Sequence, residues 1–152
     1  MTVESELTPE RIVELLHLEP LPDEGGRWAQ VWLDDAGSAI VYLLTPDDFS
    51  AVHRLRGPEI YHHYAGAPVV LTLLGPGGEV RRPVLGTDLE AGERPTVVVP
   101  GGWWQGSATT GAWSLVGTTM APPFRFEDFE LGDRSALVAA YPAARGDSEA
   151  LT

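Results

Sequence analysis

Three of the four histidines lie close together in this sequence, and a glutamate lies among them: His53, Glu59, His62 and His63. Imidazole groups titrate near neutral pH, so these residues could act as general acids or bases. Imidazole and carboxylate groups are also ligands for divalent metals such as Zn, Fe, Mn and Ni. Spacing alone therefore leaves two interpretations open: a metal site, or histidines hydrogen-bonded in the wall of a polar pocket.

The segment that begins at Glu59 has the composition of a β-strand, in which successive side chains point to opposite faces. Glu59, Tyr61 and His63 should therefore share one face. His62 should lie on the other face unless a bulge reverses it. If Glu59 faces the interior, Tyr61 and His63 should face it too.

A second cluster, Val97-Val-Val-Pro-Gly-Gly-Trp-Trp-Gln105, ends one strand, turns, and delivers two tryptophans and an amide to the next strand. One interpretation is a turn followed by aromatic residues of the core. The other is a pocket mouth, in which Trp103 and Trp104 form an aromatic wall and Gln105 is a hydrogen-bonding group.

The elements that must position these residues are predominantly β. One helix opens the chain, with Thr8 as N-cap, Pro9 at the first helical position and an apolar stripe that includes Ile12. Short apolar runs between Gly- and Pro-rich turns follow, as is typical of a sandwich or a closed barrel. The clearest strands are Trp28–Leu33, Ser38–Leu44, Ile60–Tyr64, Val69–Leu74, Val80–Leu85, Thr96–Val99 and Trp113–Thr119.

Composition excludes several classes of function. The chain has 152 residues, with 10 Lys and Arg against 22 Asp and Glu, and its formal charge of −12 disfavours binding to nucleic acids or membranes. It has no Cys, which excludes disulfides and thiolate ligands. No apolar stretch is long enough to span a bilayer, and the N-terminal segment lacks the features of a signal peptide, so we expect a cytoplasmic protein.

Several segments, taken in order, resemble the subfamily of short single-domain cupins, most of which are uncharacterised. They are Asp23-Glu-Gly-Gly26, Phe49-Ser-Ala-Val-His-Arg54, Glu59-Ile-Tyr-His-His-Tyr-Ala-Gly66, Val99-Pro-Gly-Gly-Trp-Trp-Gln105 and Ala121-Pro-Pro-Phe-Arg-Phe-Glu-Asp-Phe-Glu130. The resemblance implies an all-β cupin jelly-roll β-barrel with a short N-terminal helix, commonly a homodimer. Its pocket would be similar to those of sugar epimerases and seed-storage cupins.

The sequence departs from the cupin motifs at two positions where that family binds metal. Ala51 stands where the first His of the His-x-His pair is expected, and Gln105 stands where the second motif has its His. A neutral amide is a poorer ligand than imidazole for Zn²⁺ or Fe²⁺. By the resemblance, a metal would be held by His53, Glu59, His63 and Gln105; no other cofactor is implied.

We therefore expect residues 1–27 to form the helix and lead-in, residues 28–143 the cupin barrel, and residues 144–152 a disordered tail. The expected function is a non-redox enzyme, of the isomerase, epimerase or cyclase type, acting on a small polar or carbonyl-bearing molecule. Its catalytic groups would be His53, Glu59 and His62, and its substrate-binding groups Tyr61, His63, Trp103, Trp104 and Gln105. The alternatives are a non-catalytic metabolite- or sugar-binding module and a metal-dependent oxygenase or lyase.

Overall fold

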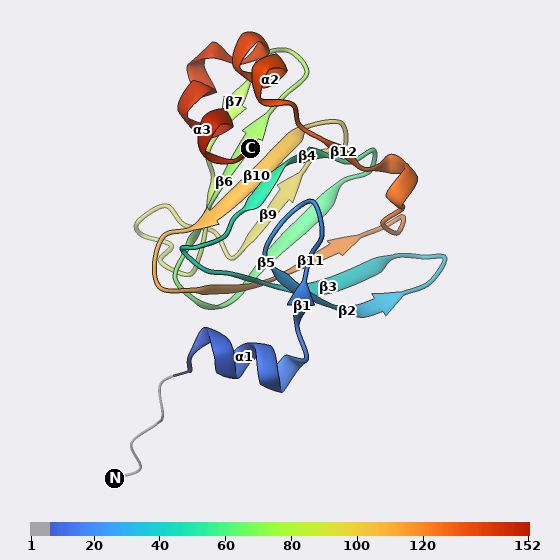
Figure 1. Cartoon of the computed structure of the whole chain (residues 1–152), viewed down its shortest axis with the longest axis vertical. Coiled ribbons are helices and arrows are strands. Elements are labelled where there is room, and N and C mark those ends of the chain that lie inside the picture. Colours follow the sequence, from blue (N-terminus) through green and yellow to red (C-terminus); the bar gives the residue numbers. More distant parts are fainter. Residues whose placement is uncertain (1–6) are drawn as a thin grey trace.

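The computed structural model describes residues 7–152, so the first six residues of the expected lead-in lie outside the described residues. The strands form two antiparallel sheets that face each other, with helices at two ends of the molecule (Figure 1). In chain order the elements are α1 (Pro9–Leu16), β1 (Glu19–Pro20), β2 (Arg27–Leu33), β3 (Ser38–Leu44), β4 (Ser50–Arg54), β5 (Glu59–Gly66), β6 (Val69–Leu74), β7 (Val80–Arg81), β8 (Val84–Leu85), β9 (Thr96–Val99), β10 (Trp104–Thr109), β11 (Ser114–Met120), the 3₁₀ turn η1 (Phe126–Asp128), β12 (Glu130–Leu131), α2 (Arg134–Ala140), the 3₁₀ turn η2 (Pro142–Ala144) and α3 (Arg145–Ala150).

Each sheet contains six strands. The first sheet has the order β1-β2-β3-β11-β5-β9, and the second has the order β12-β4-β10-β6-β7, with β8 also paired to β6. The chain passes repeatedly from one sheet to the other, as it does in a jelly roll. Within residues 7–152 no ladder joins a strand of one sheet to a strand of the other. The expected jelly roll is therefore present, but as a sandwich of two sheets and not as a closed barrel.

The expected strands recur with small shifts in their bounds. Strands β3, β6 and β9 have the bounds predicted, whereas the predicted strand over residues 80–85 is divided into β7 and β8. Pro83 lies between these two strands, and a proline has no N–H to donate to a ladder. Strand β4 was not among those predicted, and β10 was predicted only as the strand that receives Trp103, Trp104 and Gln105, without bounds.

Helix α1 covers part of the outer face of the first sheet. Its N-cap is Thr8, whose Oγ1 accepts a hydrogen bond from the backbone N–H of Arg11 at 3.2 Å, as predicted. Its buried residue Ile12 packs with Leu18 and with Leu43 of β3. This packing holds the start of the chain to the sheet and fixes where the lead-in to β2 begins.

The main core lies between the two sheets. Tyr42, Tyr61 and Val116 of the first sheet pack there against Leu71 and Leu73 of the second. Because residues two apart in a strand share a face, Glu59 of β5 lies on the same inner face as Tyr61. The site described below is built on this inner face.

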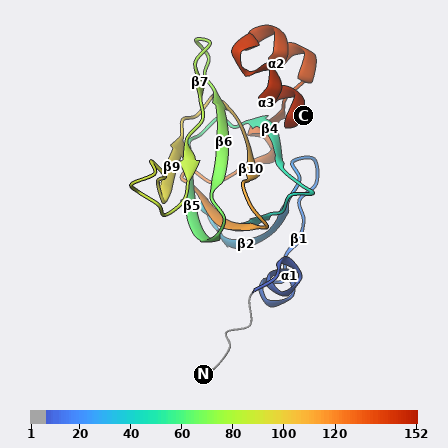
Figure 2. The ribbon, with the colours of Figure 1, turned by 90° about the vertical axis from the view of Figure 1, so that its left-hand side faces the viewer.

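The C-terminal residues form helices that pack on the second sheet, so the expectation of a disordered tail is wrong. Leu137 of α2 and Leu151 after α3 are buried with Val52 of β4 and Leu74 of β6. The backbone N–H of Val52 also donates to the carbonyl of Leu151 at 2.9 Å. Figure 2 shows α2 and α3 together beside the ends of β4 and β6. None of the helices in residues 7–152 combines the length and the apolar character needed to cross a bilayer.

Candidate functional site

A cavity of about 380 Å³ lies against the inner face of the first sheet. Its lining residues come from strands β2, β3, β5 and β11, from Leu55 after β4, and from the segments of residues 21–24 and 124–129. The residues that line it are Leu21, Pro22, Glu24, Trp28, Gln30, Leu33, Ser38, Ala39, Ile40, Tyr42, Leu55, Glu59, Tyr61, Thr118, Met120, Phe124, Phe126 and Phe129. Most of these side chains are apolar, so the few polar groups determine what chemistry the cavity can do.

Glu59 is the most deeply buried carboxylate in this lining. The residue is only 8% exposed, and its Oε1 has no hydrogen-bond partner. Burial raises the pKa of Glu59 above its ordinary value of 4.5, while the nearby His53 opposes this rise and Glu24 adds to it. Thr118 and Gln105 lie close enough to lower the pKa somewhat, although neither satisfies Oε1. Glu59 is therefore an acid or base whose pKa is shifted toward neutrality.

Glu24 is a second carboxylate in the lining, and the sequence analysis did not identify it as a site residue. A tight turn at Gly25 and Gly26, with φ of 93° and 80°, brings it from the lead-in to the cavity. A Cβ at Gly25 would lie 2.4 Å from the carbonyl oxygen of Phe49, and one at Gly26 would collide with the ring of Tyr42. Only glycine fits this turn. The segment Asp23-Glu-Gly-Gly26, already noted in the resemblance, was the signal for Glu24.

Glu24 and His53 form a pair at the edge of the cavity. Glu24 Oε1 is 3.4 Å from His53 Nε2, and Glu24 Oε2 accepts a hydrogen bond from Ser50 Oγ at 3.2 Å. His53 Nδ1 lies 2.7 Å from the carbonyl of Ala51, so Nδ1 carries a hydrogen. Nε2 is therefore the ring nitrogen that faces the Glu24 carboxylate. The His53 ring is buried and stacks on the Phe129 ring, with centroids 5.4 Å apart. Glu24 and Phe129 separate His53 from the cavity, so they belong to the lining and His53 does not.

Tyr61 and Gln105 form a second buried pair, and only Tyr61 lines the cavity. The Tyr61 hydroxyl donates to Gln105 Oε1 at 2.8 Å. Burial raises the pKa of Tyr61 well above its ordinary value, and the charge of Glu59 raises it further. Gln105 is paired across strands with His53. The structure therefore places four of the predicted site residues close together between the sheets: His53, Glu59, Tyr61 and Gln105.

The other two histidines lie away from the cavity. His62 points to the opposite face of β5 from Glu59, where its Nε2 is 3.0 Å from Thr119 Oγ1 and its ring stacks on Tyr64. His63 Nε2 is 3.1 Å from the carbonyl of Ala67. Neither residue lines the cavity. The bulge in β5 falls after His63 and so does not bring His62 inward. The geometry therefore corrects the placement of His62 and His63 in the site.

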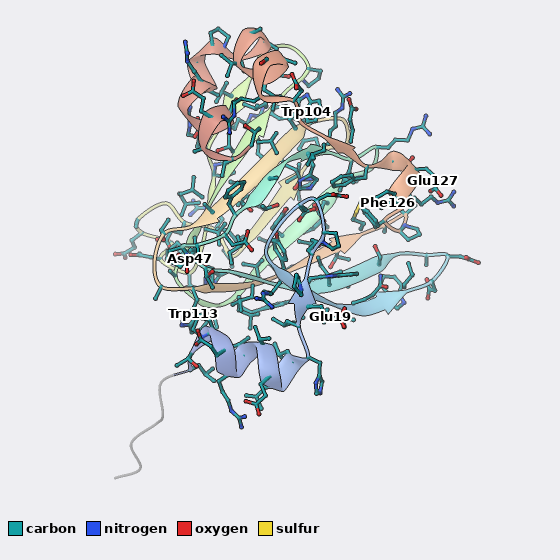
Figure 3. The ribbon with its side chains drawn as sticks, viewed as in Figure 1. Glu19, Asp47, Trp104, Trp113, Phe126 and Glu127 are labelled. Carbon is teal, nitrogen blue, oxygen red and sulfur yellow. The ribbon has the colours of Figure 1, made fainter. Side chains whose placement is uncertain are left out.

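The two tryptophans expected as a pocket wall also lie outside the lining. Trp103 packs on the main core with Arg81 over its ring, and Trp104 packs toward the C-terminal helices with Arg54 over its ring. Figure 3 shows Trp104 near those helices and Phe126 at a different side of the molecule. The interpretation of these residues as core aromatics fits the structure better. The aromatic wall instead comes from Trp28, Phe124, Phe126 and Phe129.

The proposed metal ligands do not form a ligand set. Across residues 7–152 no group of three or more His, Asp or Glu side chains is arranged to hold a metal ion. His63 is directed at Ala67, and the amide oxygen of Gln105 already accepts the Tyr61 hydroxyl. The residues present therefore do not fit a metal centre of the kind the cupin motifs imply.

Comparison with known proteins identifies relatives of the whole chain. The family described as Cupin superfamily (DUF985) matches residues 10–132. The comparison with curated proteins gave no match.

Two solved structures are similar over nearly their full length. A Shewanella oneidensis protein solved by X-ray crystallography is 33% identical, with a TM-score of 0.91 over 97% of this chain and 98% of that one. A hypothetical protein from Leishmania major is 28% identical, with a TM-score of 0.88 over 96% of this chain and 99% of that one. Oxalate decarboxylase from Bacillus subtilis is 11% identical, with a TM-score of 0.62 over 89% of this chain and 37% of that one, and it shares the fold alone.

Proposed function

Because the chain belongs to the cupin superfamily, within the family DUF985, we propose that its cavity binds a small organic molecule and transfers a proton on it. The reaction is of the non-redox isomerase type, and the substrate carries a carbonyl group on an apolar body. The observation that carries this proposal is Glu59, whose buried Oε1 lacks a hydrogen-bond partner in a cavity with an otherwise mostly apolar wall.

Glu59 is the group that moves the proton. As a carboxylate it removes a proton from the carbon next to the carbonyl; the C–H electron pair forms the C=C bond of an enolate, and the carbonyl oxygen takes the negative charge. Protonated Glu59 then returns the proton to the same carbon, or to the γ-carbon where the enolate is conjugated with a second C=C bond, and the oxyanion re-forms the carbonyl group. Burial raises the pKa of Glu59 and makes it a stronger base than an exposed carboxylate.

The neighbouring groups position Glu59 and the substrate. Thr118 and Gln105 lie against the Glu59 carboxyl group, and Tyr61 holds Gln105 through its hydroxyl. The apolar and aromatic wall packs on the body of the substrate and excludes water from the reacting end, which strengthens electrostatic interactions there. His53 acts through Glu24, with which it is paired, and is a positioning residue.

A non-catalytic binding module is the second candidate, and a specific observation favours it. An isomerase commonly uses a second acid or base that touches the substrate. The hydroxyls of Tyr61 and Tyr42 are already donated to Gln105 and to the carbonyl of Gly25, and His53 lies behind the wall. A cavity with Glu59 alone could recognise a polar group without transforming it.

Solvent exchange separates these two candidates. The purified chain is incubated in D₂O with cyclic and aryl ketones that fit the cavity, and NMR follows both ligand binding and loss of the proton next to the carbonyl. We expect Glu59→Gln to lower the enzyme-dependent exchange rate by at least about 100-fold, the usual contribution of a general base. The matched control is Glu90→Gln, because Glu90 is exposed and outside the cavity.

Three other outcomes would change the assignment. Binding without exchange would support the binding module. Exchange that survives Glu59→Gln would exclude Glu59 as the base. Neither binding nor exchange with any ketone would contradict the proposed function as a whole.

A further inference from the structure

The charged residues of the cavity are all of one sign. Of the described residues that line it, Glu24 and Glu59 are charged, and none is Arg, Lys or His. Buried carboxylates usually have a cationic partner, because an unpaired buried charge is costly. A ligand that brings a positive charge would supply what the lining lacks.

The two carboxylates are not equally satisfied by the protein. Glu24 contacts His53 and Ser50 through its two oxygens. Glu59 has an orphaned Oε1 and is 8% exposed. One imidazole can supply at most one positive charge, so two ionised carboxylates leave a net negative charge at this end of the cavity. The unsatisfied acceptor is Glu59, and an N–H donor is the group that fits it.

Aromatic rings line the same cavity. Phe129 stacks on Phe126 with ring centroids 5.9 Å apart and meets Phe124 edge-on at 6.4 Å. Trp28 lines the cavity from β2. Faces of aromatic rings attract organic cations, and they also pack on apolar substituents. A carboxylate combined with several aromatic rings is therefore suited to an ammonium group on an apolar body.

We infer that the cavity selects an organic cation, an amine carried on an apolar or aromatic body, whose N–H group donates to the Glu59 carboxylate. The same lining disfavours carboxylates and other anions. The inference names the class of ligand for the cavity of the proposed function and rests on that cavity being the ligand site. It does not depend on whether the bound molecule is transformed.

A matched series of ligands tests the sign of the charge. Benzylamine, benzyl alcohol and benzoate have similar size and differ in charge at pH 7.5. Their affinities for the full chain are measured by calorimetry or by NMR titration. We expect benzylamine to bind about tenfold more tightly than benzyl alcohol, as one cation–π contact with a charge-assisted hydrogen bond would give. Benzoate should bind most weakly.

Variants test whether Glu59 causes the preference. Glu59→Gln keeps the size of the side chain, so it should lose the preference for benzylamine while its affinity for benzyl alcohol is retained. Retained binding of benzyl alcohol also shows that the variant is folded. Glu90→Gln should bind all three ligands as the parent chain does, because that residue is exposed and outside the lining.

The failures of the two proposals can be told apart. If benzyl alcohol or benzoate binds as tightly as benzylamine, or if the ketones bind and none of these three ligands does, the inference is overturned and the proposed function stands. A preference for benzylamine that persists in Glu59→Gln also overturns it. A preference for benzylamine without exchange of any ketone supports the inference and removes the catalytic part of the proposed function.

Discussion

Glu59 places an ionisable group where water hardly reaches it, and this makes the stability of the fold depend on pH. Burial raises its pKa in the folded chain above the ordinary value of 4.5. At a pH between the ordinary pKa and the raised pKa, Glu59 is protonated in the folded chain and ionised in the unfolded chain. By linkage, the free energy of unfolding therefore falls as the pH rises through this interval, and the loss persists above it. Each pH unit of the interval corresponds to about 1.4 kcal/mol.

We predict that Glu59→Gln raises the melting temperature at pH 8 and leaves it nearly unchanged at pH 4. At pH 8 the variant has no buried negative charge, whereas at pH 4 both side chains are neutral. Thermal unfolding of the parent chain and the variant at several pH values measures the difference, with Glu90→Gln as the exposed control. A difference that does not grow with pH would show that Glu59 is not destabilised by its burial.

Residue patterns predicted part of the candidate site. The cupin-like motifs predicted that His53, Glu59 and Gln105 meet in the interior, and the structure places all three there. They did not predict that Glu24 stands between His53 and the cavity, because that contact depends on the turn at Gly25 and on packing across the two sheets. Trp103 and Trp104 could pack in the core or line a pocket, because the sequence does not say toward which face of the sheet each side chain points. Both interpretations therefore stayed open until the structure was known.

At the scale of elements, strands with strong β-formers were predicted with their bounds, whereas weaker strands were missed or were predicted without bounds. Strand β3 is rich in Ile, Val and Tyr, and its predicted and observed bounds agree. Strand β10 carries Gly106, Ser107 and Ala108, which have little preference for a strand. It forms because β4 and β6 pair with it on both sides. Tertiary pairing of this kind cannot be read from local composition.

The C-terminal helices are the clearest case in which tertiary packing overrides local composition. Residues 144–152 were expected to form a disordered tail, yet Leu151 is buried against the second sheet and its carbonyl accepts a hydrogen bond from the backbone N–H of Val52. The helix α3 is short, so its stability must come from this packing.

We predict that Leu151→Ala lowers the free energy of unfolding by about 2–4 kcal/mol, because the substitution removes buried methyl groups and leaves a cavity. Urea unfolding followed by circular dichroism measures the change. Leu89→Ala is the control, since Leu89 is 58% exposed and should cost little. An equal effect of the two substitutions would mean that the C-terminal segment does not contribute to the fold.

At the scale of the whole molecule, two features have opposite effects on the pairing of two copies: the open edge of strand β2 favours it and the net charge opposes it. Strand β2 pairs with β1 only at Arg27 and Trp28, so within the described residues the rest of its outer edge has no strand partner. Val31 and Leu33, on this edge, are 65% and 57% exposed. An open edge with apolar side chains favours pairing with a second copy. The formal charge of −12 on each copy opposes it.

We therefore predict a homodimer that pairs through β2 and is favoured by salt. Salt screens the repulsion between the two negatively charged copies, so the dimer fraction should rise between about 0.05 and 0.5 M NaCl, where the screening length falls severalfold. Val31→Lys should shift the chain to monomer, because a lysine on an edge strand resists pairing. Leu89→Lys introduces the same residue at an exposed site away from β2 and should leave the dimer intact. Size-exclusion chromatography with light scattering reports the mass. A chain that stays monomeric at high salt and high concentration, or a dimer that tolerates Val31→Lys, would rule out pairing through this edge.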